Sequence, residues 1–248
     1  MAEAGEGRAF RRRVFYIPGY DPFHPRRYRE LYRKEGAAQA ALSGYDLALK
    51  PKRSRGPYGW RVEATMDGQA AEVDVEVLVW SDIVKGSMGG GIAQTYWQLA
   101  RTAWAYIATG VLFRLMRLRK GPVIAALYPI GMLLLQLGLA VAAGAGLAAA
   151  IGLVAPAGVG WPFGAALTWL VLRWFRRQDN RFFAYYLMHD YAFSARWGGA
   201  NPPALEARMV DFRQTIAAAL TEDWDEVLVV GHSSGAHLAV SILADLIR

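Results

Sequence analysis

The chain has 248 residues, of which 54% are hydrophobic, with a formal net charge of +7 and no cysteine. The missing thiols exclude disulfides, thiolate catalysis and cysteine-based metal sites, and we expect no cofactor and no metal. The basic residues cluster beside the longest apolar run and do not form one long stripe. This distribution favours a lipid bilayer over nucleic acid as the partner.

The first part of the chain predicts a strand, a loop and a helix. Residues 1–12 lack the apolar segment of a secretory signal peptide and are expected to form a disordered lead. A short apolar run at residues 14–17 predicts a buried strand, and the Pro/Gly-rich residues 18–25 predict a loop after it. Helical periodicity over residues 26–42 predicts a helix that ends near Gly44.

Three further strands are predicted at residues 45–50, 59–66 and 71–80. Asp67 and Gly68 between the last two are a hairpin signal, and apolar and acidic residues alternate in the last strand. The Gly-rich residues 85–91 are expected to form a flexible connector. They lack the lysine and Ser/Thr of a P-loop and the spacing of a dinucleotide-binding motif.

Residues 92–118 predict a long helix that is rich in tryptophan and tyrosine and has a basic end. Aromatic rings beside basic residues are typical of the membrane interface, so we expect residues 92–120 to form an interfacial helix. The alternative is a core helix with a solvated end.

Residues 121–172 contain no Asp, Glu, Lys or Arg. A single membrane span needs about 20 apolar residues, so this run is long enough for two spans and a turn. We therefore predict a transmembrane hairpin over residues 121–174. Its turn is expected at residues 155–162, with residues 142–146 as the alternative.

Basic residues flank the apolar run on both sides. Those before it are Arg114, Arg117, Arg119 and Lys120, and those after it are Arg173, Arg176, Arg177 and Arg181. Because positive charge stays on the cytoplasmic side and a hairpin returns the chain to the side it left, the segments before and after the hairpin are expected in the cytoplasm.

After the hairpin, an aromatic helix is predicted at residues 176–195, and residues 198–203 break it. An amphipathic helix follows, with apolar residues from Leu205 to Leu220 at helical spacing. Residues 227–230 then read as a buried strand.

The sequence Gly231-His232-Ser233-Ser234-Gly235 follows that strand and precedes a helical pattern. It fits the motif G-x-S-x-G, in which a serine lies on a sharp strand-to-helix turn between small residues. The apolar strand before the motif and the helix after it are the context that this motif requires. Ser233 is therefore the candidate nucleophile.

With this motif and the early sequence VFYIPGYDP, the chain resembles the α/β-hydrolase family. The resemblance implies an oxyanion hole formed by the backbone N–H groups of Tyr20, in the loop after Gly19, and of Ser234. The stretch from Gly19 to Glu35 is also similar to the opening of bacterial membrane-associated hydrolase-like proteins, which implies the bacterial inner membrane as the location.

The resemblance implies a fold of the α/β class. Its architecture would be an α/β-hydrolase-like sheet with an inserted transmembrane helical hairpin. Residues 13–84 would form the N-terminal part of the hydrolase-like domain. Residues 175–248 would continue it up to the nucleophile turn and its helix.

The family places its acid and histidine after the serine, but only fifteen residues follow Ser233. The four histidines of the chain, His24, His189, His232 and His237, are each expected to be structural. We therefore expect the natural protein to continue beyond Arg248 and to supply both groups there. The competing account is a complete chain without catalytic activity.

The sequence thus predicts a membrane-anchored serine hydrolase of esterase, lipase or thioesterase type, acting on an ester or lipid-like substrate. The alternative is a catalytically inactive hydrolase-like membrane protein with a binding or assembly role. Transport through the hairpin is disfavoured, because its spans contain no ionisable residue and only one long polar side chain, Gln136. The oligomeric state does not follow from the sequence.

Overall fold

The computed structural model describes residues 8–53, 55–117, 120–156, 158–198 and 200–247. The chain divides into two compact units. The sheet unit consists of the residues up to Gly86 and those from Pro202 onward, and the helical unit is Ser87–Asn201. Residues 175–201, which the sequence-based division assigned to the hydrolase-like domain, lie in the helical unit.

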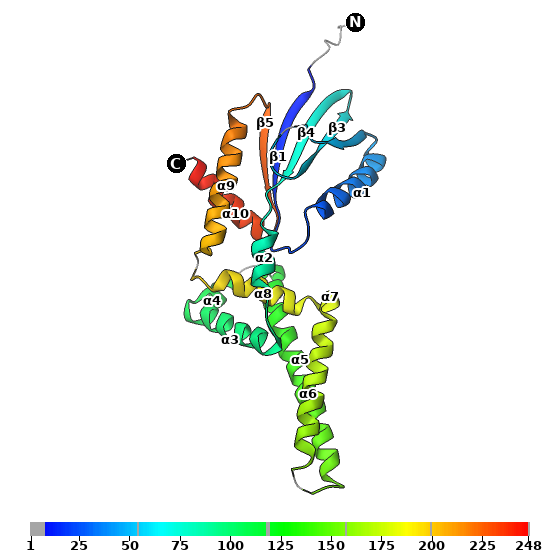
Figure 1. Cartoon of the computed structure of the whole chain (residues 1–248), viewed down its shortest axis with the longest axis vertical. Coiled ribbons are helices and arrows are strands. Elements are labelled where there is room, and N and C mark those ends of the chain that lie inside the picture. Colours follow the sequence, from blue (N-terminus) through cyan, green and yellow to red (C-terminus); the bar gives the residue numbers. More distant parts are fainter. Residues whose placement is uncertain (1–7, 54, 118–119, 157, 199, 248) are drawn as a thin grey trace. The chain divides into compact units, whose positions relative to one another are not determined.

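The sheet unit contains a five-stranded mixed sheet, so the predicted α/β class is confirmed (Figure 1). The strands lie in the order β2-β3-β4-β1-β5. The central strand β1 is parallel to β4 and β5, whereas β2, β3 and β4 form an antiparallel meander. The bounds are β1 Phe10–Ile17, β2 Asp46–Pro51, β3 Gly59–Met66, β4 Gln69–Val77 and β5 Glu226–Gly231.

Strand β1 begins at Phe10, so the expectation of a disordered lead over residues 1–12 was wrong from that residue on. The strand continues this far because its first residues pair with β4 and Arg12 forms an ion pair with Glu226 of β5. The remaining part of that expectation, residues 1–7, lies outside the described residues. The hairpin signal is confirmed, since Asp67 and Gly68 have φ angles of 50° and 78°, as a type I′ turn requires.

Four helices accompany the sheet: α1 Arg26–Ser43, α2 Ser81–Ser87, α9 Pro203–Leu220 and α10 Ser234–Leu246. Helix α1 lies on one side of the sheet and α9 and α10 on the other (Figure 1). The predicted helix end at Gly44 is confirmed, because this residue has a φ of 71° and donates its N–H to the carbonyl of Ala40. Strand β4 ends at Val77, three residues before the predicted end at residue 80, and helix α2 takes up part of the connector predicted at residues 85–91.

The helical unit contains α3 Ile92–Ala108, α4 Val111–Leu115, α5 Lys120–Gly152, α6 Gly160–Arg177, α7 Asp179–Phe182 and α8 Ala184–Ala195. The single helix predicted at residues 92–118 is broken between α3 and α4, where Gly110 has a φ of 70°. Arg119 of its predicted basic end lies outside the described residues. The helix predicted at residues 176–195 is also broken, at Phe183 with a φ of 53°.

Helices α5 and α6 form an antiparallel hairpin whose turn joins Gly152 to Gly160. The alternative turn at residues 142–146 was wrong, because these residues lie inside α5. The two helices approach closely at glycines: a Cβ on Gly144 would lie 2.4 Å from the carbonyl oxygen of Gly164, and one on Gly160 would lie 2.3 Å from that of Ala148. Among the described helices, only α5 is long and apolar enough to cross a membrane, over Val123–Gly152.

Candidate active site

The turn between β5 and α10 holds Ser233 in an unusual backbone conformation. Its φ and ψ are 54° and −124°, a combination that glycine adopts easily and other residues rarely adopt. Strain of this kind costs on the order of 1–3 kcal/mol and persists only where the surrounding structure enforces it. The serine side chain is exposed at the end of the strand.

Glycines on both sides of Ser233 allow this sharp turn. A Cβ on Gly231 would lie 2.5 Å from the Cα of Ala236, at the start of the helix. A Cβ on Gly235 would lie 2.2 Å from the carbonyl oxygen of Ile17 and 2.4 Å from that of Pro18. The helix therefore begins in direct contact with the end of β1, and no larger residue fits at either glycine.

The loop after β1 lies directly against Ser233. A Cβ on Gly19 would be 3.0 Å from the Cβ of Ser233, although more than 200 residues separate the two in the sequence. Strand pairing produces this contact, because β1 and β5 run parallel with Ile17 beside Gly231. The structure thus brings together the two segments that the sequence singled out separately.

The rest of the loop is fixed by aromatic residues. The indole N–H of Trp80 donates to the carbonyl of Pro18 at 2.9 Å. The ring of Tyr20 is 2% exposed, and its centroid lies 6.3 Å from that of Trp80. These contacts hold the backbone on either side of Gly19 in one conformation.

Among the described residues of the sheet unit, no histidine side chain is hydrogen-bonded to Ser233, and the serine hydroxyl has no hydrogen-bond partner there. His232 precedes the serine, but its side chain is exposed, and its backbone N–H donates to Ile17. His237 is also exposed, on α10. His24 accepts the N–H of Arg26 through Nδ1, at the start of α1.

His189, the fourth histidine, belongs to the helical unit, where it is 8% exposed on α8. Burial lowers the pKa of this imidazole, and the positive charge of Arg176 lowers it further. Its Nδ1 has no hydrogen-bond partner among the described residues. None of the three histidines of the sheet unit is therefore hydrogen-bonded to the serine.

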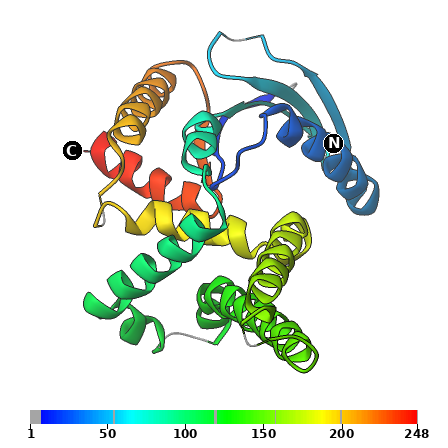
Figure 2. The same cartoon turned by 60° about the horizontal axis from the view of Figure 1, so that its bottom comes forward.

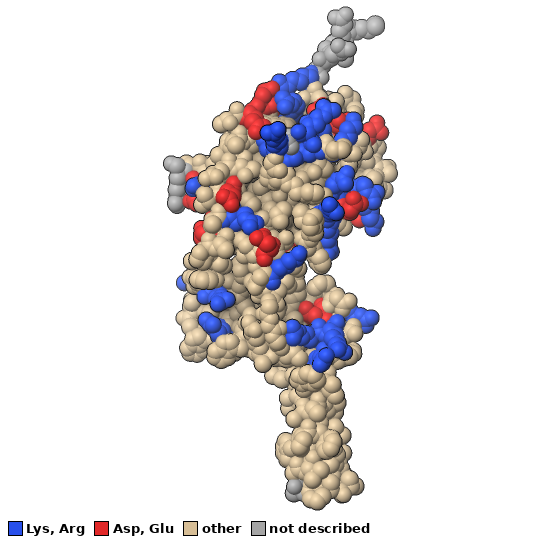
Figure 3. Space-filling model, in the orientation of Figure 1, with Lys and Arg blue, Asp and Glu red and all other residues tan. Residues whose placement is uncertain are grey.

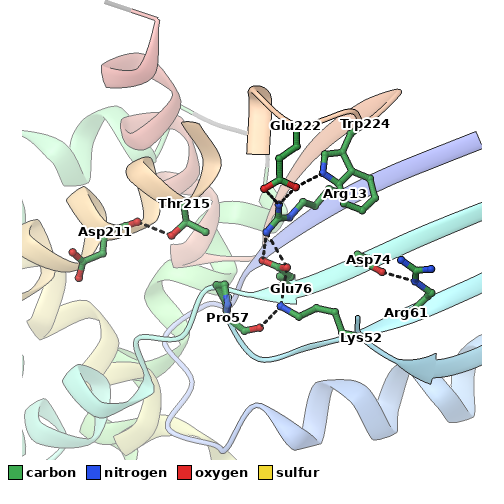
Figure 4. Close-up of polar contacts among 10 residues, drawn as sticks. All are labelled: Arg13, Lys52, Pro57, Arg61, Asp74, Glu76, Asp211, Thr215, Glu222 and Trp224. Atoms are coloured by element: carbon green, nitrogen blue, oxygen red, sulfur yellow. Dashed lines mark hydrogen bonds and ion pairs between the residues drawn. The ribbon is translucent and has the colours of Figure 1, made fainter. Parts of the chain in front are cut away.

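A buried ion network underlies the sheet near this site, and the sequence analysis missed it (Figure 4). The acidic residues of β4 alternate with valines, a pattern typical of a strand with one solvated face. Instead, Asp74 is 1% exposed and Glu76 is 0% exposed. Arg61 of β3 donates to Asp74 at 2.9 Å, and Arg13 of β1 donates to Glu76 at 3.1 Å.

The network also connects β1 to the segment that leads into β5. Arg13 donates to both carboxylate oxygens of Glu222 at 2.8 Å, and Lys52 donates to Glu76 at 2.8 Å. The indole N–H of Trp224 and the guanidinium of Arg13 lower the pKa of Glu222. Basic residues on neighbouring strands were the available signal, but only strand order and register show that they face these carboxylates.

An apolar groove of about 930 Å³ lies between α1 and the sheet. Its lining includes Val14, Tyr16, Tyr32, Trp60 and Val230. The groove follows β1 toward its carboxyl end, and Val230 directly precedes Gly231 of the serine turn. The apolar lining therefore continues to the residue before that turn.

Within the described residues, no group of three or more His, Asp and Glu side chains could hold a metal ion. Comparison of the chain with protein-family models, with curated proteins and with solved structures finds no match in any of the three.

Proposed function

We propose that this chain carries the nucleophile and oxyanion hole of a membrane-anchored serine hydrolase that acts on an ester or thioester. The observation that carries the proposal is the enforced backbone conformation of Ser233, with Gly19 in contact with it. A strained residue at an exposed turn is a recurring feature of catalytic sites. The same constellation supports the resemblance to α/β-hydrolases, since it joins the two segments on which that resemblance depends.

In the proposed reaction, the Oγ of Ser233 attacks the carbonyl carbon of the substrate and the C=O electrons move onto oxygen. The N–H groups of Tyr20 and Ser234 would stabilise that oxyanion. Collapse of the intermediate breaks the bond to the leaving alcohol or thiol, which takes the proton removed from the serine. Water then hydrolyses the acyl-enzyme.

The reaction needs a general base, and no described histidine of the sheet unit is hydrogen-bonded to Ser233. The proposal therefore requires a histidine and an acid from outside the described residues of the sheet unit. Strand β5 is an edge of the sheet, and Leu228 and Val230 on it are each 38% exposed. If a parallel strand were added at this edge, the loop that follows it would lie at the carboxyl end of the sheet, where Ser233 also lies.

The apolar groove supports a substrate with an acyl chain, because its lining is mainly aromatic and aliphatic and it leads toward the serine turn. Membrane anchoring is proposed from the apolar hairpin and the basic residues at its base, with the sheet unit in the cytoplasm. A lipid-like ester is the substrate class that fits both features.

A second proposal is an inactive hydrolase-like membrane protein with a binding or assembly role. The observation that favours it is that no described histidine side chain of the sheet unit is hydrogen-bonded to Ser233. Both proposals share the fold and the membrane anchor. They differ in whether the serine hydroxyl is activated.

Labelling with a fluorophosphonate probe tests the proposed function, because the probe reacts with activated serines. We expect the native protein from its source to be labelled and the Ser233→Ala variant to lose the label. The matched control is Ser241→Ala, since this serine lies two turns along the same helix and donates only to the carbonyl of His237. Absence of labelling in the native protein, or labelling that survives Ser233→Ala, would overturn the hydrolase proposal.

A further inference from the structure

The α5–α6 hairpin has an apolar surface that no other described part of the chain covers. Large apolar side chains are exposed along both of its arms, including Leu134, Leu135, Leu139, Trp161, Phe163 and Leu170. At the turn, Leu153 and Val154 are 86% and 88% exposed. Figure 3 shows no charged side chain on the hairpin beyond its base. A continuous apolar surface of this size needs an apolar environment.

The distribution of charge identifies this environment as a lipid bilayer. The helical unit carries 10 Lys and Arg residues and only 2 Asp and Glu residues, whereas the sheet unit carries 18 and 19. The net positive charge of the chain therefore comes from the unit that bears the hairpin. One of its two carboxylates, Asp179, is already bound by the N–H groups of Tyr185 and Tyr186. The positive charge at the base of the hairpin is suited to contact anionic lipid headgroups.

The first arm of the hairpin is only partly free to enter a bilayer. The start of α5 is packed in the helical unit, where Tyr191 donates to the carbonyl of Ala125 and Tyr96 donates to that of Leu133. Leu133 itself is fully buried in a cluster with Tyr185 of α8. The free part of α5 therefore begins after Leu133.

The second arm is shorter still. From Gly160, at the start of α6, to Arg173 the chain advances 13 residues, or about 20 Å in a helix, against about 30 Å for the hydrocarbon core. Arg173 does not extend away from the tip, because its guanidinium lies 5.0 Å from the ring of Trp169, one turn closer to the tip. This cation and this indole both favour the headgroup layer. The α6 segment from Gly160 to Thr168 is then about 12 Å long, and α5 continues about 6 Å beyond the contact of Gly160 with Ala148, to Gly152. The hydrocarbon part of the hairpin before the turn is therefore about 18 Å long, against about 30 Å for the whole hydrocarbon core.

Several backbone N–H groups of the described turn residues are satisfied internally, which lowers the cost of placing them in hydrocarbon. The N–H groups of Leu153, Val154 and Ala155 donate to carbonyls of the last turn of α5. Those of Val159 and Trp161 donate to Pro156 and Gly158. No charged side chain lies at the turn to hold it in water.

Helix α3 provides a second surface for the same bilayer. It runs across the direction of the hairpin and lies on the side of α8 toward which the hairpin points (Figures 1 and 2). Its buried residues, which include Leu99, face inward. Trp97 and Trp104 lie on the opposite face of α3 and are 64% and 72% exposed, with Arg101 between them. This arrangement is typical of a helix that lies in the plane of a membrane interface.

We propose that the helical unit is a monotopic anchor: the hairpin enters the bilayer from one side, its tip stops inside the hydrocarbon core, and α3 lies flat in the headgroup layer on the side of entry. The partner is a bilayer surface that contains anionic lipids. This inference rests on the membrane anchoring in the proposed function, but not on the hydrolytic reaction. The sequence predicted two full spans, with the turn on the opposite side of the membrane. In this proposal neither arm crosses the bilayer, and the turn stays inside it.

Single cysteines in this cysteine-free chain can test the topology. We would place one at Val154 in the turn and a matched one at Arg181, which is exposed at the base, and label sealed vesicles of both orientations with a membrane-impermeant maleimide. The expected result is labelling of Arg181→Cys from one side only. Val154→Cys should be labelled from neither side until the vesicles are dissolved in SDS.

Two other outcomes would overturn the inference, and they are distinguishable. Labelling of Val154→Cys only from the side opposite to Arg181→Cys would mean that the hairpin crosses the bilayer, which leaves the anchoring intact. Labelling from the same side as Arg181→Cys would mean that the hairpin lies outside the bilayer, which removes the anchoring as well. Fluorophosphonate labelling at Ser233 is independent of all three results.

Nitroxide labels give a second measurement that does not depend on side-specific access. Exposed positions along the hairpin are Val154 at the turn, Phe163 and Leu170. At each position, the accessibility of the nitroxide to oxygen is compared with its accessibility to a water-soluble nickel reagent. For a hairpin whose tip stops inside the bilayer, this ratio should be highest at Val154 and decrease toward Leu170. A maximum at Phe163, with lower values at both other positions, would show a hairpin that crosses.

Discussion

Replacing Ser233 with glycine should stabilise the sheet unit even though it removes the proposed nucleophile. The serine has a φ of 54° and a ψ of −124°, and release of this strain is worth about 1–3 kcal/mol. Glycine loses more chain entropy on folding, which costs about 0.5–1 kcal/mol. The expected net gain is about 0–2.5 kcal/mol, or up to roughly 10 °C in the unfolding midpoint for a chain of this size.

The assay is thermal unfolding of the purified full-length chain in detergent, followed by tryptophan fluorescence. Ser233→Ala is the first control, because alanine removes the hydroxyl but keeps the strain, so its midpoint should not rise. Ser241→Gly is the second control, since glycine inside α10 should cost about 1 kcal/mol. A Ser233→Gly variant that loses as much stability as Ser241→Gly would refute the assignment of strain to this turn.

Two further predictions concern buried charged and titratable groups. Glu76→Ala should destabilise the protein by about 3–5 kcal/mol, because it leaves Arg13 and Lys52 without their buried carboxylate. The control Glu63→Ala, at an exposed ion pair, should change stability by less than about 1 kcal/mol. Similar denaturation midpoints for the two variants would contradict a structural role of the network. Burial keeps the pKa of the folded-state His189 imidazole below its ordinary value of 6.5. The neutral imidazole therefore contributes its full stability above pH 6.5, and this contribution is lost as the pH falls from 6.5 through the folded pKa. Stability curves from pH 8 to 5 should be flatter for His189→Leu than for the native chain, and parallel curves would exclude this linkage.

Local sequence signals determined the elements around the candidate site. The alternation of apolar and polar residues and the pair Asp67-Gly68 gave the β3–β4 hairpin, because turn chemistry and strand period are properties of neighbouring residues. The helix end at Gly44 and the apolar stripe of α9 followed from the same kind of signal. The glycines at positions 231 and 235 indicated the turn at Ser233, because a strand and a helix can meet so closely only where small residues flank the junction.

The break at Phe183, between α7 and α8, was not predictable in this way. Phe183 adopts a φ of 53°, which a phenylalanine rarely does, and the carboxylate of Asp179 then binds the first N–H groups of α8. The periodicity of residues 176–195 is helical throughout, so it gives no sign of the break. Tertiary contacts within the helical unit decide it.

The sequence by itself determined which segments are apolar, where the chain must turn, and which serine lies at a sharp strand-to-helix junction, because each of these depends on residues close together in the chain. Only the tertiary structure decided that Gly19 touches Ser233 and that Glu76 is buried beside Arg13. These two facts depend on the parallel pairing of β1 with β5 and with β4, which joins residues far apart in the sequence. Strand order and register arise from the packing of the whole sheet, and no local pattern encodes them.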